Sequence, residues 1–155
     1  MGHWRAVRAR STLPLMTSLV TRTPVATPEE ANEHFERRLA FETDAADVAR
    51  DVRMGAAEFV IVDVRSAEAF AAGHLPGAIS APGGLGTDFP DDLLVVYCWG
   101  PGCNGSQRAA ARLSAQGHRV KEMLGGFEYW VREGHPVEGT AAEPLSRRAD
   151  HELVG

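Results

Sequence analysis

Two cysteines in one glycine-rich loop are the residues of this chain best suited to chemistry. Cys98 follows the apolar run 93–97, and the loop then reads Trp99-Gly100-Pro101-Gly102-Cys103-Asn104-Gly105 before a helical stretch at 106–113. Between a buried strand and a helix N-terminus, the helix dipole and the backbone N–H groups stabilise a thiolate. We therefore predict that Cys98 is a nucleophile whose pKa is depressed.

The loop around Cys98 is predicted to form an anion cradle. Its glycines allow the backbone to curl around a sulfur anion, either through positive φ or through close approach. Trp99 has two open interpretations, since it could line the mouth of the site or cover the loop. The predicted substrate-binding residues are Trp99, Gly100, Gly102, Cys103, Asn104, Gly105 and Ser106.

Cys103 also has two open interpretations. If the two sulfurs approach each other, Cys103 can attack an oxidised or persulfidated Cys98 and form a disulfide. Otherwise Cys103 is a small loop residue that faces elsewhere. Spacing alone does not supply the geometry that a disulfide requires.

The order of expected elements predicts an α/β fold with a parallel sheet. Strands are expected at 59–62, 78–80, 93–97 and 120–124, and helices at 67–72, 106–113 and from 126 onward. Strands that alternate with helices form parallel sheets covered on both faces, and ligands bind beyond the carboxyl ends of the strands. The segment 81–92 is rich in glycine and proline, which predicts a surface loop.

Four motifs in order resemble the rhodanese family of sulfurtransferases. Asp63-Val64-Arg65 follows a buried strand, Glu68-x-Phe70-x-x-Gly73-His74-Leu75-Pro76-Gly77-Ala78 is similar to the family's signature stretch, and Val95-Val96-Tyr97-Cys98 matches the strand that delivers the catalytic cysteine. Gly125-Gly126-Phe127-x-x-Trp130 followed by Gly134-His135-Pro136 completes the pattern, which spans about residues 57–139.

The resemblance implies a five-stranded α/β rhodanese-like fold and transfer of sulfane sulfur. Cys98 would take sulfur from a donor such as thiosulfate, carry it as a persulfide, and pass it to a thiol or cyanide acceptor. No cofactor and no metal are expected. Asp63 and Arg65 would form a structural pair that braces the loops, and His74 would support its turn.

The loop departs from the family pattern in one respect. Rhodaneses carry an Arg five residues after the cysteine, and relatives that act on phosphate or arsenate carry it six residues after. Here those positions are Cys103 and Asn104. The guanidinium that clamps a tetrahedral dianion is therefore absent from the loop, and Arg108 either substitutes for it or points to solvent. Arsenate reductase or phosphatase activity, and a non-catalytic binding or redox-sensing module, stay as alternatives.

Composition sets the remaining expectations. The chain has 155 residues and a formal net charge of −5, which argues against nucleic acid as the main partner. Its apolar runs are too short to span a membrane. Two cysteines in one loop fit a reducing compartment, which we expect to be the cytoplasm. The sequence does not indicate the oligomeric state.

The expected domain organisation has four parts. Residues 1–27 are basic and contain no acid, which is typical of a flexible tail, although a transit peptide and a natural start at Met16 stay open. Residues 28–56 are expected to be an N-terminal helical extension, in which Thr27 and Glu30 form a capping box. Residues 57–140 are the expected rhodanese-like domain, and residues 141–155 a flexible C-terminal tail.

Overall fold

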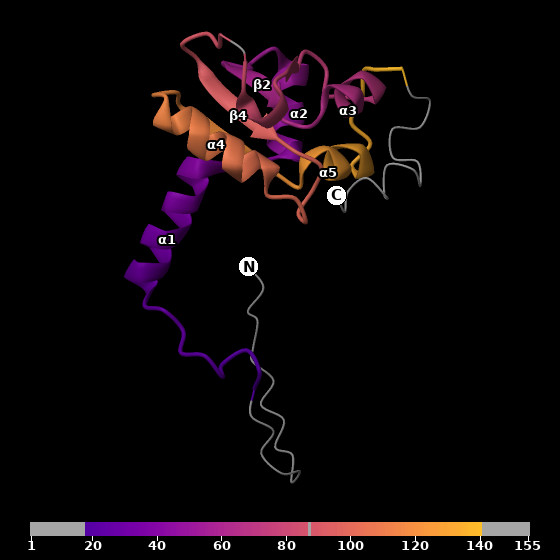
Figure 1. Ribbon diagram of the computed structural model, residues 1–155. Helices are drawn as coiled ribbons and strands as arrows, with labels where there is room; N and C mark the ends of the chain where they lie inside the picture. Colours follow the sequence, from indigo (N-terminus) through magenta and orange to yellow (C-terminus); the bar gives the residue numbers. More distant parts are fainter. Residues whose placement is uncertain (1–17, 87, 141–155) are drawn as a thin grey trace. The chain divides into compact units, whose positions relative to one another are not determined.

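The computed structural model describes residues 18–86 and 88–140, and Figure 1 shows its elements. Residues 1–17 of the expected N-terminal tail at 1–27, and the whole expected C-terminal tail at 141–155, lie outside the described residues. The helices are α1 (Pro28–Phe41), α2 (Ala45–Met54), α3 (Ala67–Ala72), α4 (Gly105–Ala115) and α5 (Gly126–Arg132), with a short 3₁₀ helix η1 (Pro82–Gly84). The strands are β1 (Glu42–Asp44), β2 (Phe59–Asp63), β3 (Ile79–Ser80), β4 (Leu93–Tyr97) and β5 (Val120–Leu124).

The chain divides into two compact units, residues 1–34 and 35–155. The first unit contains the start of α1, and the expected capping box is confirmed there. The Thr27 N–H donates to Glu30 Oε2 at 2.9 Å, and the Glu30 N–H donates to Thr27 Oγ1 at 3.2 Å. These reciprocal bonds satisfy two N–H groups that a helix start leaves unpaired.

The second unit is built on one five-stranded sheet in the order β1-β5-β4-β2-β3, and each pair of neighbours is parallel. The predicted α/β fold with a five-stranded parallel sheet is confirmed. β4 lies at the centre, and in its register Asp63 at the end of β2 is opposite Tyr97. The residue after Tyr97 is Cys98, so the cysteine emerges at the carboxyl edge of the sheet.

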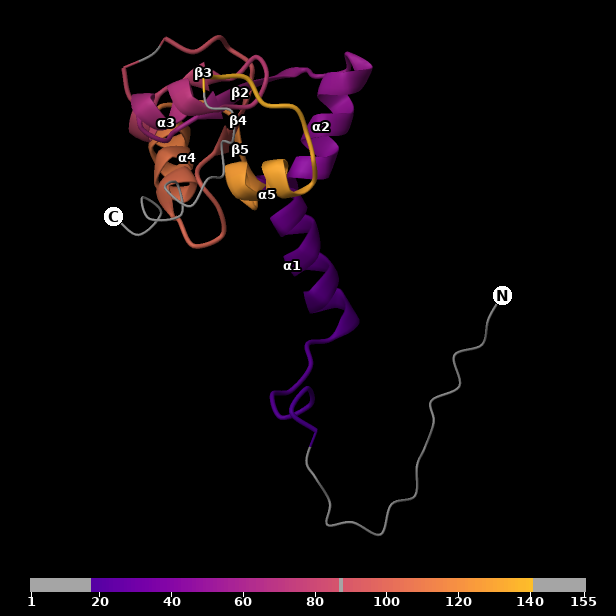
Figure 2. The same cartoon turned by 90° about the vertical axis from the view of Figure 1, so that its right-hand side faces the viewer.

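Side chains of the central strands alternate between two cores, as strand geometry requires. Ile61, Val95, Tyr97 and Met123 pack with α2 and α5 on one face. Val62, Leu94 and Val96 pack with α4 on the other, together with Cys98. Figure 2 shows the sheet between α4 on one side and α2 with α5 on the other. Coverage of both faces explains why β2 and β4 are apolar runs.

The strand β1 was not expected from the sequence. Glu-Thr-Asp has no apolar residue, and it becomes a strand because it pairs with β5, Thr43 lying opposite Met123. The helix α2 lies within the expected helical extension, and it buries Val48 in the core shared with α5. Residues 42–54, which we had placed in an extension, thus contribute a strand and a helix to the sheet domain.

The expectation of a surface loop at 81–92 is only partly correct. Ala81 is fully buried, and Gly84 is buried at the end of η1. Gly84 has a φ of +70°, and a Cβ there would lie 3.2 Å from Ala109 Cβ of α4. This segment therefore begins as part of the core against α4.

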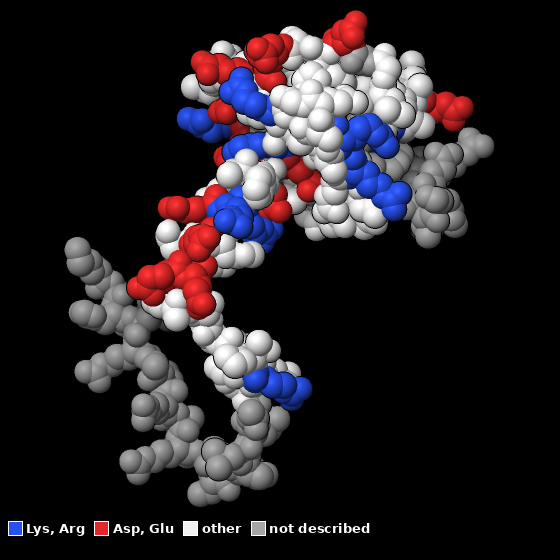
Figure 3. Space-filling model, turned by 60° about the vertical axis from the view of Figure 1, so that its left-hand side comes forward, with Lys and Arg blue, Asp and Glu red and all other residues white. Residues whose placement is uncertain are grey.

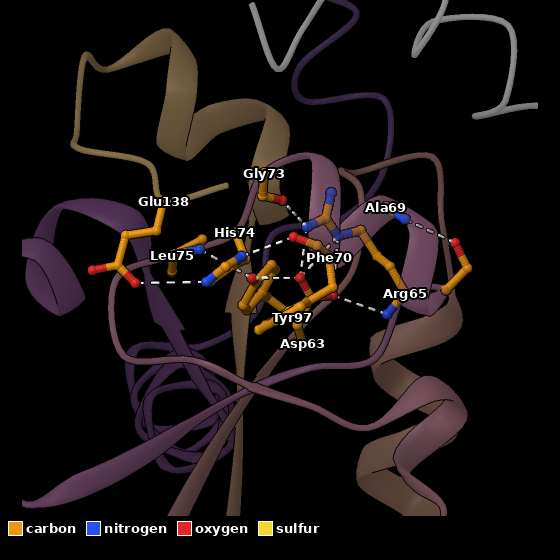
Figure 4. A network of polar contacts seen from close by, with 10 residues as sticks. Asp63, Arg65, Ala69, Phe70, Gly73, His74, Leu75, Tyr97 and Glu138 are labelled. Carbon is orange, nitrogen blue, oxygen red and sulfur yellow. Dashed lines mark hydrogen bonds and ion pairs between the residues drawn. The ribbon is translucent and has the colours of Figure 1, made fainter. Parts of the chain in front are cut away.

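A buried polar network joins the ends of β2 and β4 (Figure 4). Arg65 Nη2 donates to Asp63 Oδ2 at 2.6 Å and to the Gly73 carbonyl at 2.6 Å. Tyr97 Oη donates to the same Asp63 oxygen at 2.6 Å and accepts from the Leu75 N–H at 3.2 Å. Both charged side chains have no exposed surface.

Burial, followed by the Asp63 charge, raises the pKa of Tyr97, so the phenol stays protonated and able to donate. The predicted structural pairing of Asp63 with Arg65 is confirmed as a contact.

None of the helices in the described part of the chain is both long enough and apolar enough to cross a membrane.

We predict that Arg65→Met lowers the free energy of unfolding by about 3–5 kcal/mol, because it leaves the Asp63 carboxylate buried without its ion pair. Urea denaturation would measure the loss. The matched control is Arg50→Met. Arg50 pairs with Asp51 at 3.0 Å but its side chain is 66% exposed, and such pairs contribute about 0–1 kcal/mol. If both variants lose the same free energy of unfolding, the buried pair of Arg65 with Asp63 does not stabilise the fold more than an exposed pair does.

Candidate active site at the Cys98 loop

The start of α5 holds the backbone on which Cys98 lies. The Phe127 N–H donates to the Cys98 carbonyl at 2.9 Å, and the Glu128 N–H donates to the Trp99 carbonyl at 2.7 Å. Gly126 has a φ of +58°, and a Cβ there would lie 2.5 Å from the Cys98 carbonyl oxygen. The sequence identified Gly125-Gly126 as a helix start, but the contact with the Cys98 loop emerges only in the structure.

Trp99 covers the loop and does not line the cavity beside Cys98. Its ring meets Phe127 edge to face, with centroids 5.9 Å apart. The Arg65 guanidinium carbon lies 4.6 Å from the Trp99 ring centroid and 4.1 Å from that of Phe127. Arg65 therefore packs among the rings that flank the cysteine, which is a positioning role.

The two sulfurs of the loop are in contact. Cys98 Sγ and Cys103 Sγ lie 2.7 Å apart, both cysteines are free thiols, and either can donate to the other. The Gly105 N–H at the start of α4 donates to Cys103 Sγ at 3.4 Å. The structure thus decides the geometric question about Cys103, because its side chain faces Cys98.

The loop glycines act through close approach and not through positive φ. None of Gly100, Gly102 and Gly105 has a positive φ. A Cβ on Gly105 would lie 2.8 Å from Cys98 Sγ and 3.3 Å from Cys103 Sγ, and one on Gly100 would lie 2.7 Å from Glu128 Oε2. A Cβ on Gly102 would meet nothing within 4 Å. Gly105 is therefore the glycine that leaves room for the sulfur pair.

The pKa of Cys98 is raised to about 12, against our expectation of a depressed value. Burial of the thiol is the largest cause, followed by the hydrogen bond with Cys103; the Trp99 N–H works in the opposite direction. Helix N-termini depress a thiol pKa when the thiol is partly solvated or lies near a cation. Here the Gly105 N–H at the start of α4 donates to Cys103 Sγ, and Cys98 faces that second sulfur.

The sulfur pair opens into a cavity of about 420 Å³. Four predicted residues line it, namely Cys98, Gly100, Cys103 and Ser106. The other predicted residues do not line it, namely Trp99, Gly102, Asn104, Gly105, Asp63, Arg65, His74 and Arg108. The cavity also contains residues that sequence reasoning missed, among them Asp44, Glu122, Tyr129 and Glu133. The spacing of these residues along the chain does not indicate a shared site, because β1, β5 and α5 bring them together only in the fold.

The charged residues that line this cavity are acidic. They are Asp44, Glu122 and Glu133, and no Lys or Arg lines it within the described residues. Glu122 Oε1 accepts a hydrogen bond from Ser106 Oγ at 2.6 Å. Arg108 is exposed on α4, which resolves the open question about it in favour of solvent. A dianion in this cavity would have no guanidinium to clamp it.

His74 lies in its turn and away from the cavity. Its ring stacks on Phe70 with centroids 3.7 Å apart, and Nδ1 contacts the Phe70 carbonyl at 2.8 Å. Its backbone pairs with Glu138 in an isolated antiparallel bridge. These contacts support the predicted structural role. In the described segments, no group of three His, Cys, Asp or Glu side chains could hold a metal ion.

The family model of the rhodanese-like domain matches residues 45–133. The chain belongs to the rhodanese-like domain family. Part of the chain is 42% identical over 85 residues to the thiosulfate sulfurtransferase GlpE of Pseudomonas putida, a match that covers 51% of this chain and 74% of that protein. The match of this rhodanese-like domain begins at Ala45 in α2, inside the segment that we had placed in an extension.

Two further similarities are to a protein with a solved structure and to a transcriptional regulator. The BH2092 protein of Bacillus halodurans has a solved structure with a TM-score of 0.73 and 40% identity, covering 82% of this chain and 99% of that one. The HTH-type transcriptional regulator Rv0324 of Mycobacterium tuberculosis is 35% identical over 91 residues, covering 56% of this chain and 40% of the regulator. The relatives of this chain thus include a protein named as an enzyme and a protein named as a transcriptional regulator.

We predict that Gly105→Ala lowers the free energy of unfolding by about 1–3 kcal/mol, the range for overpacked sites, because the new Cβ meets Cys98 Sγ at 2.8 Å. Helix propensity alone would give the opposite sign, since alanine is the better helix former. Thermal or urea unfolding would measure the change. Gly102→Ala is the matched control, and it should show no comparable loss. If Gly105→Ala is as stable as Gly102→Ala, the close-approach argument is wrong.

We predict that alkylation of Cys98 by iodoacetamide keeps accelerating up to pH 10, without a plateau near the ordinary thiol pKa of about 8.5. A raised pKa means that less of the reactive thiolate is present at each pH below it. Peptide mass spectrometry would follow Cys98 separately from Cys103. In Cys103→Ala the profile should shift to lower pH, because both contributions of Cys103 raise the Cys98 pKa. A plateau of the alkylation rate below pH 8 in the wild type would contradict a raised pKa of Cys98.

Proposed function

We propose that this protein is a sulfurtransferase that carries sulfane sulfur as a persulfide on Cys98. The observation that carries the proposal is the position of the Cys98 sulfur, at the carboxyl end of the central strand and on the wall of a 420 Å³ cavity. The thiosulfate sulfurtransferases among the relatives of this rhodanese-like domain support the same reaction class.

The proposed reaction has two displacements. The Cys98 thiolate attacks the outer sulfur of thiosulfate, the bond between the two sulfurs of thiosulfate breaks, and sulfite leaves with the bonding electron pair. An acceptor thiolate or cyanide then attacks the terminal sulfur of the persulfide and releases the Cys98 thiolate. Because the resting thiol has a raised pKa, the first step should be faster at alkaline pH.

The charge of the cavity argues against the phosphatase and arsenate reductase alternatives. Phosphate and arsenate need positive groups or converging N–H donors where their charge develops, whereas the charged residues lining this cavity are carboxylates. Thiosulfate is also a dianion. We therefore expect a donor with less negative charge at its reacting end to load Cys98 more readily than thiosulfate does.

A second candidate function is a binding or redox-sensing module without turnover. The relative that favours it is the transcriptional regulator, in which the matched part covers 40% of that protein. The contact between the two thiols also suits redox sensing, because a nearby second cysteine converts an oxidised one into a disulfide. Under this alternative, chemistry at Cys98 would occur once and not in cycles.

The proposed partners are a small-molecule sulfur donor and a thiol or cyanide acceptor, with the cytoplasm as the proposed compartment. On the face shown in Figure 3, Lys and Arg side chains lie among acidic and uncharged residues. Together with the net charge of −5, this supports the proposal that nucleic acid is not a partner.

We predict that the wild-type protein releases sulfite from thiosulfate and forms thiocyanate when cyanide is added, and that Cys98→Ser reduces both to background. A serine hydroxyl is not ionised at neutral pH and cannot carry a persulfide. Colorimetric assays of sulfite and thiocyanate would measure the two steps separately, and a melting curve would show that the variant is folded.

Two results would contradict the proposed function. Sulfite and thiocyanate formation that persists in Cys98→Ser would remove Cys98 from the reaction. Hydrolysis of an aryl phosphate that is lost in Cys98→Ser, without sulfite release from thiosulfate, would favour the phosphatase alternative. A single round of sulfite release with neither thiocyanate nor sulfide would instead favour the sensing module.

A further inference from the structure

Cys103 is placed to react with whatever Cys98 carries. The two Sγ atoms lie 2.7 Å apart, whereas a disulfide bond measures about 2.05 Å. Both cysteines belong to one short loop, so a small displacement of the loop would join them. Both sulfurs also line the same cavity, so a sulfur atom added to Cys98 would lie next to Cys103.

Two features of the loop keep this approach open. Gly105 has no Cβ, and one built there would lie within 3.3 Å of both sulfurs. The Gly105 N–H donates to Cys103 Sγ and not to Cys98. It belongs to the first turn of α4, an 11-residue helix, where the helix dipole favours negative charge. The loop therefore directs its helical N–H group to the sulfur that would act as the second nucleophile.

We propose that Cys103 is a resolving cysteine that releases the sulfur from the Cys98 persulfide as hydrosulfide. This inference rests on the proposed function, because it requires the persulfide to form. The Cys103 thiolate attacks Cys98 Sγ, the bond between that atom and the terminal sulfur breaks, and the terminal sulfur leaves as HS⁻ with the electron pair. A Cys98–Cys103 disulfide is formed. In this step the terminal sulfur is reduced and Cys103 Sγ is oxidised, whereas Cys98 Sγ exchanges one S–S bond for another and keeps its oxidation state.

The step gives this site a second outcome besides transfer to an acceptor. Attack by an external thiol or cyanide on the terminal sulfur returns Cys98 as a thiol, whereas attack by Cys103 on the inner sulfur gives hydrosulfide and a disulfide. A further turnover then needs a dithiol reductant, which exchanges with the disulfide and leaves as a cyclic disulfide. The class of reaction that regenerates the two thiols is therefore thiol–disulfide exchange between a dithiol and the Cys98–Cys103 disulfide.

The test compares wild type, Cys103→Ser and Cys98→Ser under anaerobic conditions. Each protein is reduced, desalted, incubated with thiosulfate without added thiol, and desalted again. Sulfite release reports loading of Cys98, sulfide release reports resolution, and intact and peptide mass spectrometry report the state of the cysteines. Cys98→Ser controls for sulfur bound elsewhere.

In the wild type we expect sulfite and then sulfide, with a chain lighter by two hydrogens that yields a Cys98–Cys103 disulfide peptide. A small dithiol should restore both thiols. In Cys103→Ser we expect sulfite but no sulfide, and a chain heavier by one sulfur atom that is located on Cys98.

The possible failures are distinguishable. If the wild type and Cys103→Ser both keep the added sulfur, release no sulfide and form no disulfide, the resolving role is wrong while the proposed function stands. A disulfide that forms without sulfide release also overturns the resolving role. If neither protein releases sulfite or gains sulfur, the proposed function fails, and this inference fails with it.

Discussion

The buried pair of Asp63 and Arg65 is the interaction on which the architecture of the site depends. Both side chains lie at the carboxyl edge of the sheet without solvent, so each charge requires the other and the hydrogen bonds around it. Through this pair β2 is joined to the Gly73 turn and, by the Tyr97 hydroxyl, to β4 and Leu75. The residue after Tyr97 is Cys98, so the network fixes the strand end from which Cys98 emerges.

The same packing determines the chemical character of the cysteine. The α5 N–H groups that could have faced an anion instead hold the carbonyls of Cys98 and Trp99. The Arg65 guanidinium, which lies over the Trp99 ring, is paired with Asp63 and packed among aromatic rings. What faces Cys98 is a second thiol; burial of Cys98, and after it the hydrogen bond with Cys103, raises the pKa of Cys98. Cys98 is therefore a protonated thiol at neutral pH. The reactivity of Cys98 depends on the neighbouring sulfur and on the solvation of the cavity.

Charge and sulfur content together distinguish this cavity from an oxyanion-binding site of the same fold. Three carboxylates line it, and two sulfurs lie in contact at its wall. Such surroundings disfavour binding of tetrahedral dianions, for which a loop arginine would be needed. Under the proposed function, the contact of the two sulfurs suits exchange between sulfur atoms, in which a thiolate attacks a sulfur and displaces another one.

Local signals in the sequence determined most of the second unit. Side-chain caps at Asp44 and Ser66 begin α2 and α3, and the left-handed Gly55 ends α2, because these signals act over three or four residues. The runs of β2 and β4 are apolar because both faces are covered. The four motifs, read in order, were sufficient to indicate the family and to place Cys98 beyond the end of a strand.

Only the tertiary structure decided the features that set the chemistry. β1 is a strand because β5 pairs with it, and no apolar pattern in β1 predicts that pairing. Gly102 and Gly105 look alike in the sequence, yet only Gly105 lies against the sulfurs. The contact of Cys103 with Cys98, the exposure of Arg108, the acidic cavity and the raised pKa all depend on how distant segments pack. Propensity and spacing act along the chain, whereas burial and charge at a site are sums over neighbours that only the fold brings together.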